Sequence, residues 1–247
     1  MSIESQEELE GMRAAGRVVA LALEAMRAAV RAGVTTAELD GVAAEVLARH
    51  GARSAPRLVY DFPGATCISV NREAVHGIPG TRVLQPGDVV TLDVTVELNG
   101  YFADAAVTVG VEPLPRPARQ LIEAAESAWL AAAAVARAGE SLSAVGGAVE
   151  AEVRRRGFRV LRDLCGHGIG RTIHEPPNVL NYYDRASDRR LTEGLVIALE
   201  PIVSVSTQRT RRLPDGWTIV SADDSLCAHH EHTIMVTAGE PVILTAA

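Results

Sequence analysis

The chain has 247 residues, with 31 acidic against 24 basic side chains and a formal net charge of -7. Single α/β domains reach roughly 250 residues, so one domain or a tightly joined pair is expected. A hydrophobic share of 47% is enough for a buried core and excludes disorder as the dominant state. The acidic balance argues against nucleic acid or an anionic membrane surface as the main partner.

Arginine supplies every basic side chain, because the sequence contains no lysine. Chemistries that need a lysine side chain, such as a Schiff-base lysine or a P-loop lysine, are therefore excluded. The three cysteines, Cys67, Cys165 and Cys227, form no CxxC pair, so neither a disulfide framework nor a thiolate zinc site is indicated. The N-terminal segment is acidic, unlike a secretory signal, and no apolar run is long enough to span a bilayer. A cytoplasmic protein is expected.

Two helices followed by strands are predicted for the first part of the chain. Residues 5–8 (SQEE) are typical of a helix N-terminus, and apolar residues then recur at helical spacing until Gly33. A second helix is expected from Thr35 to about His50. Residues 58–111 are rich in Val, Ile and Thr in short alternating segments, which favours strands.

The second part of the chain repeats this order. Residues 112–117 have proline at every second position, and a linker is expected there because proline lacks an amide donor. Helices are then predicted over about 118–137 and 143–156, again followed by strands.

A shift of 106 residues aligns two glycines of each part, Gly33 with Gly139 and Gly51 with Gly157. The alignment predicts one domain, residues 1–247, made of related halves at about 1–112 and 118–247, with a site in the crevice between them. The alternative is a chance match between helices rich in alanine and glycine.

A β-hairpin with two aspartates on one face is predicted around Asn99-Gly100, because this pair is the strongest short signal for a type I′ turn. With that turn as the centre, Thr95 faces Asp104, and Asp93 lies on the same side of the sheet. The two aspartates are then diagonal neighbours, about 7–8 Å apart at Cβ. They either share a cation, which is the favoured interpretation, or cap the sheet and pair with arginine.

Six of the seven histidines fall in three short segments and are His76, His167, His174, His229, His230 and His232. His167 lies between glycines, which let a ligand approach the backbone closely. Glu200 ends an apolar run, and Glu231 precedes another. Burying either carboxylate costs free energy unless a positive charge faces it.

Four carboxylates and an imidazole suit two divalent ions such as Mn, Fe, Co or Zn. A two-metal site implies a bridging hydroxide that attacks a polarised carbonyl or phosphoryl group.

Six segments, in this order and spacing, resemble type I methionine aminopeptidases: CISVNREAVHGIP, LDVTV, NGYFADAA, CGHGIGRTIHEPP, ALEP and EHTIMV. The resemblance covers nearly the whole chain. It implies the pita-bread fold, an α/β (α+β) fold in which duplicated halves form an antiparallel sheet covered by helices, with the dimetal site between them.

The resemblance also implies five metal ligands, which are Asp93, Asp104, His167, Glu200 and Glu231. Asp104 and Glu231 would bridge both ions, and Glu200 would also take the proton from the bridging water. His76 and His174 would contact the substrate and stabilise the developing oxyanion, as imidazole donors can.

An apolar pocket for the methionine side chain is implied beside His76, with the lining residues Phe62, Cys67, Ile173 and Trp217. The chain departs from the commonest family pattern around this site. An aromatic residue is more usual at Ile173 and a tyrosine at Val59. Glutamine and an aromatic residue are more usual at His229 and His230. These changes bear on pocket shape, turnover and selectivity.

The resemblance therefore predicts a cytoplasmic, monomeric metalloexopeptidase that uses Co, Mn, Fe or Zn. It would remove the initiator methionine from nascent polypeptides with a small second residue, including chains at the ribosome, and bind neither nucleic acid nor membrane. Two alternatives stay open at this point. An Xaa-Pro peptidase of the same fold would usually carry an extra N-terminal domain, and a non-catalytic relative would lose metal ligands, whereas all five are present here.

Overall fold

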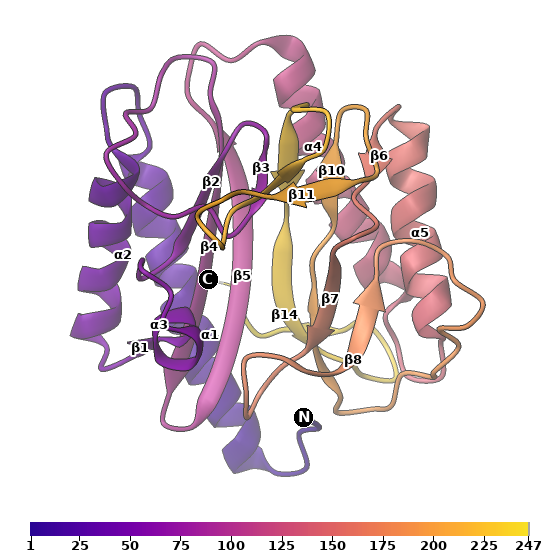
Figure 1. Ribbon diagram of the computed structural model, residues 1–247. Helices are drawn as coiled ribbons and strands as arrows, with labels where there is room; N and C mark the ends of the chain where they lie inside the picture. The colour runs from indigo at the N-terminus through magenta and orange to yellow at the C-terminus, as the bar shows by residue number, and fades with distance from the viewer. Residues whose placement is uncertain (247) are drawn as a thin grey trace.

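The computed structural model describes residues 1–246 as a mixed α/β structure with antiparallel sheets covered by helices (Figure 1). The helices are α1 (Gln6–Ala29), α2 (Thr36–Arg49), α3 (Ala55–Tyr60), α4 (Arg116–Val135) and α5 (Leu142–Arg155). The strands are β1 (Arg53–Ser54), β2 (Cys67–Val70), β3 (Glu73–Val75), β4 (Val89–Leu98), β5 (Tyr101–Gly110), β6 (Arg159–Val160), β7 (Cys165–Gly168), β8 (Glu175–Leu180), β9 (Val196–Leu199), β10 (Ile202–Ser204), β11 (Thr210–Arg212), β12 (Ile219–Ser221), β13 (Cys227–His229), β14 (Glu231–Met235) and β15 (Val242–Ile243).

The largest sheet has the strand order β1-β4-β5-β14-β9-β7-β8, with β2 paired to β4 and β15 to β14. Two smaller sheets have the orders β13-β10-β6 and β11-β12-β3. In Figure 1 α1 and α2 lie at the left and α5 at the right, and α4 begins at the upper centre behind the strands. No helix within residues 1–246 combines the length and apolar character that a membrane crossing needs.

Side-chain caps start the helices where the sequence predicts. The Ser5 hydroxyl accepts from the Glu8 amide at the start of α1. Thr35 and Glu38 form a complete capping box at the start of α2, which satisfies amides that have no partner inside the helix. The predicted linker is too long, however, because α4 already begins at Arg116. Pro117 fits the first helical turn, where its missing N–H would have no intrahelical acceptor.

The two parts of the chain correspond closely in their elements. Both ends of α5 lie 106 residues after the matching ends of α2, 142 against 36 and 155 against 49, and β6 follows β1 at the same distance. The aligned glycines share the left-handed conformation, with φ of 90° at Gly33 against 92° at Gly139, and 67° at Gly51 against 88° at Gly157. These matches support the predicted duplication, because the same local constraints recur at the same offset.

The β4–β5 hairpin has the predicted register, with Leu98 opposite Tyr101 and Thr95 opposite Asp104. Both turn residues, Asn99 and Gly100, have positive φ, as the type I′ geometry requires. The apolar face of β4 (Leu92, Val94 and Val96) packs into the core that also includes α1. Alternation of side chains then turns the aspartates to the opposite face of the sheet.

Two adjacent glycines in α5 give a matched test of helix packing. A Cβ at Gly146 would lie 2.3 Å from the Tyr182 carbonyl oxygen and 2.5 Å from that of Leu180, whereas one at Gly147 meets nothing closer than 3.6 Å. Gly146→Ala should lower the free energy of unfolding by about 1–3 kcal/mol through overpacking. Gly147→Ala should raise it by up to about 1 kcal/mol through helix propensity. Urea unfolding measures both, and equal effects would contradict this packing.

Candidate metal centre

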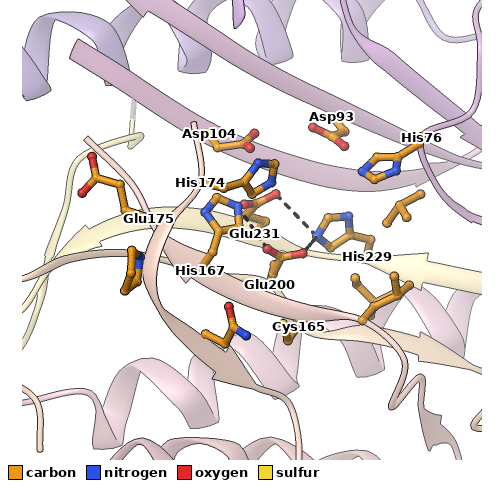
Figure 2. A pocket seen from close by; sticks show the side chains of 15 residues that line it. His76, Asp93, Asp104, Cys165, His167, His174, Glu175, Glu200, His229 and Glu231 are labelled. Atoms are coloured by element: carbon orange, nitrogen blue, oxygen red, sulfur yellow. Dashed lines mark ion pairs between the residues drawn. The ribbon is translucent and has the colours of Figure 1, made fainter. Parts of the chain in front are cut away.

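The strand order of the large sheet brings the five predicted metal ligands together. The neighbouring strands carry them as Asp93 on β4, Asp104 on β5, Glu231 on β14, Glu200 directly after β9, and His167 on β7. Pairing sets Glu231 opposite Ala106 and His167 opposite Ala198. Figure 2 shows the five side chains around one cavity, which they line together. Residues from distant parts of the sequence therefore converge because their strands are hydrogen-bonded neighbours.

Distances within this cluster suit shared ions. Asp104, His167 and Glu231 each offer one ligand atom, and these atoms lie within 4.8 Å of one another. The Nε2 atom of His167 is 3.5 Å from Oε1 of Glu200. Asp93 lies close enough to Asp104 for the Asp104 charge to raise the pKa of Asp93.

Burial makes the carboxylate cluster unfavourable without a cation. Desolvation raises the pKa of Asp104 to about 6. It also raises the pKa values of Asp93, Glu200 and Glu231 well above the ordinary range, and the charge of Asp104 adds to each shift. Within the described chain, Asp104 Oδ1 and Glu231 Oε1 are buried without a hydrogen-bond partner. Unpaired buried oxygens beside an imidazole form a donor set that fits divalent metal ions.

Hydrogen bonds from neighbouring strands hold this cluster in place. The Thr233 hydroxyl accepts from the Asp104 amide at 2.9 Å and donates to the Asp104 carbonyl at 2.8 Å. The side-chain Nδ2 of Asn181, which directly follows β8, donates to the Glu200 carbonyl at 2.9 Å. Sequence reasoning missed both residues, although Thr233 follows Glu231 at the two-residue spacing of one strand face.

His76 and His174 border the cluster and also face a second, adjoining cavity. The rings of His174 and His167 are 4.3 Å apart at their centroids. Burial lowers the pKa of His76 to about 4 and lowers that of His174, so both rings are neutral at pH 7 and each carries one N–H donor. His76 has a φ of 58°, a region that non-glycine residues rarely occupy and that recurs at functional sites.

Three hydrogen bonds fix the segment that carries His174. Oε1 of Glu175 accepts from the Arg171 amide at 2.7 Å and from the Thr172 amide at 2.9 Å. The Tyr60 hydroxyl lies 2.6 Å from Nδ1 of His174. Tyr60 is not among the predicted site residues, although the family pattern has a tyrosine at the preceding position, Val59.

The adjoining cavity is lined by all four predicted pocket residues, which are Phe62, Cys67, Ile173 and Trp217. Phe62 and Trp217 pack edge to face with centroids 5.2 Å apart. Cys67 lies opposite Asp93 in the β2–β4 pairing, which sets the pocket directly beside the carboxylates. An apolar side chain held here would therefore lie next to the metal cluster.

This antiparallel α/β fold with a buried carboxylate–histidine cluster defines a pita-bread metallohydrolase. The family model described as metallopeptidase family M24 matches residues 10–238. The chain therefore belongs to that family.

Comparison with known proteins agrees with this assignment. The chain is 42% identical to methionine aminopeptidase 2 of Bacillus subtilis, and the match covers 99% of both chains. The crystal structure of the methionine aminopeptidase from Thermotoga maritima superposes with a TM-score of 0.96 at 35% identity, covering 100% of both chains. These relatives confirm the resemblance to methionine aminopeptidases. The prolidase from Pyrococcus furiosus, at 22% identity and a TM-score of 0.78 over 99% of this chain and 65% of that one, shares the fold.

Metal binding should stabilise the folded chain, because the unfolded chain has no preformed cluster. Adding Mn²⁺ or Co²⁺ to chelator-treated protein at about 100 times the Kd should raise the free energy of unfolding by about 2.7 kcal/mol. Glu231→Gln should lose most of this gain, whereas Glu126→Gln, an exposed change on α4, should keep it. Chemical unfolding with and without metal measures both. A full gain in Glu231→Gln would contradict the assignment of the cluster.

Proposed function

We propose that the chain is a methionyl aminopeptidase that removes the initiator methionine from new proteins whose second residue is small. One observation carries this proposal: the carboxylate–histidine cluster and the pocket lined by Phe62 and Trp217 adjoin each other, and His76 and His174 face both. The relatives named methionine aminopeptidases support it. Residues 1–247 would form one catalytic domain with related halves at about 1–112 and 118–247. We further propose a monomer that acts in the cytoplasm on nascent N-termini, including chains at the ribosome.

The pocket would hold the methionine side chain. Phe62 and Trp217 offer ring surfaces, and sulfur–aromatic contacts favour a thioether there. Ile173 and Cys67 close the pocket with small or branched side chains, and both are buried. The first peptide bond of the substrate would then lie between the pocket and the carboxylates.

The five ligands would hold two divalent ions, with Asp104 and Glu231 bridging them. Asp93 would complete the ligands of one ion, and His167 with Glu200 those of the other. When bound, such ions polarise the scissile carbonyl and make water acidic enough to attack at neutral pH. Mn, Fe, Co and Zn all suit this mixture of carboxylate and imidazole.

The remaining chemistry belongs to residues of the chain. Glu200 would accept the proton of the attacking water and pass it to the leaving amine. Neutral His76 and His174 would donate N–H groups to the substrate, where negative charge grows on the carbonyl oxygen. The contact with Tyr60 occupies Nδ1 of His174 and leaves its Nε2 free for this purpose.

The substrate rule can be tested with matched peptides. Metal-loaded protein should release methionine from Met-Ala-Ser and not from Met-Lys-Ser, as the proposed preference for a small second residue requires. Release is followed by chromatography, with bound metal verified by elemental analysis. Absence of release from Met-Ala-Ser, with metal bound, would contradict the proposed function, and preferential cleavage of an Xaa-Pro peptide would replace it with a different exopeptidase.

The role of Glu200 can be separated from metal retention. Glu200→Gln keeps the size of the side chain but removes its basicity, so kcat should fall by about 10²–10⁴. Glu193→Gln, an exposed change just before β9, is the control and should leave kcat unchanged. Both proteins are assayed at equal, measured metal content. A kcat for Glu200→Gln within twofold of the unaltered chain would contradict the role.

A further inference from the structure

His229 is a buried polar side chain that the proposed mechanism leaves without a role. It ends β13, two residues before Glu231, and is 1% exposed. Both of its ring nitrogens lack a hydrogen-bond partner among residues 1–246. A buried imidazole without partners is costly, because its nitrogens lose their bonds to water. The ring nitrogens of His229 are therefore available to a ligand from outside the chain, such as a metal ion.

The backbone of His229 is fixed tightly against the strand that carries Asp104. The Thr108 hydroxyl on β5 accepts from the His229 amide at 2.8 Å and donates to the His229 carbonyl at 2.7 Å. β13 also pairs with β10, where Ile202 lies opposite His229. These contacts orient the ring toward the carboxylates, as Figure 2 shows.

The Nε2 atom of His229 points at two proposed metal ligands. It lies 3.5 Å from Oε2 of Glu231 and 3.9 Å from Oε2 of Glu200 (Figure 2, dashed lines). Two ligand atoms that bind the same tetrahedral ion, each at about 2.1 Å, are roughly 3.4 Å apart. Both distances from the His229 nitrogen are therefore within about 0.5 Å of the spacing between two ligands of one ion.

We propose that His229 is a sixth ligand of the metal centre and binds the ion shared by Glu200 and Glu231. The inference deepens the proposed function, because it rests on the same centre. Glu200 then lies between two imidazoles, since its other oxygen is 3.5 Å from Nε2 of His167. A second imidazole increases the preference for Co²⁺ and Zn²⁺ over Mn²⁺ and Mg²⁺, because imidazole suits the former ions better than carboxylate does.

The adjacent residue, His230, provides a matched control. Its ring packs against Trp129 and His232, with centroids 5.8 and 5.4 Å apart. It lines a different cavity, together with Arg27, and not the one that holds the carboxylates. The same substitution at the two neighbouring positions therefore changes the centre in one protein and leaves it intact in the other.

Metal binding itself, without any activity assay, tests the proposal. Chelator-treated protein is titrated with Co²⁺ and followed by calorimetry and by the visible absorption of the bound ion. His229→Gln should weaken binding of one Co²⁺ by about tenfold or more and change the visible bands. His230→Gln should match the unaltered chain in both. Unchanged affinity, within twofold, and unchanged bands in His229→Gln would overturn the proposal.

A measurement on the unaltered chain covers the case in which His229→Gln fails to fold. Proton NMR of the Co²⁺-loaded protein resolves the exchangeable N–H of each imidazole bound to the ions. Two such resonances are expected, from His167 and His229, and a single one would overturn the proposal. If the unaltered chain binds no Co²⁺ at all, that result would instead contradict the metal centre on which the proposed function rests.

Discussion

The burial of four carboxylates in one small volume is the constraint on which the rest of the structure depends. Like charges in a dry environment repel each other, and the raised pKa values of these groups express that cost. The β-sheet holds the carboxylates together, because each is on or directly beside a strand that pairs with a neighbour on both sides. Divalent ions would replace the repulsion between the carboxylates with attraction to the ions. The stability of the fold and the binding of metal are therefore coupled.

The junction between β5 and β14 joins the two parts of the chain at this point. Asp93 and Asp104 come from before the proline-rich segment, and His167, Glu200 and Glu231 come from after it. The β5–β14 ladder places Glu231 opposite Ala106 and His232 opposite Ala105, so it fixes the two ligand groups relative to each other. Neither part of the chain holds the whole ligand set, which agrees with a site built between related halves.

The neighbouring imidazoles form two pairs, one that also lines the adjoining pocket and one that points at Glu200. His76 and His174 border both the metal cluster and the apolar pocket, where a substrate carbonyl would lie between them. His167 and His229 instead point at the oxygens of Glu200 from its two sides. All four rings lose protons readily because burial disfavours the imidazolium form, so they remain available as neutral donors or ligands.

The sequence by itself determined the features that depend on local geometry. The β4–β5 register follows from Asn99-Gly100, because the turn type sets which residues face each other, and the helix starts follow from their caps. The start of α4 was predicted wrongly, since local reasoning treated all the prolines as breakers although the first helical turn tolerates them. The motifs also identified the five candidate ligands through family resemblance.

Only the tertiary structure decided which of these residues meet. Tyr60 and His174, which are in contact, are 114 residues apart in the sequence. Thr233 and Asp104, which are hydrogen-bonded, are 129 residues apart. Long-range strand pairing creates such contacts, and no local pattern encodes them. The unpartnered ring of His229 is of the same kind: its sequence shows an unusual histidine, but only packing shows that nothing within the described chain satisfies it. Burial and proximity are properties of the folded sheet, because they depend on strands far apart in sequence lying side by side.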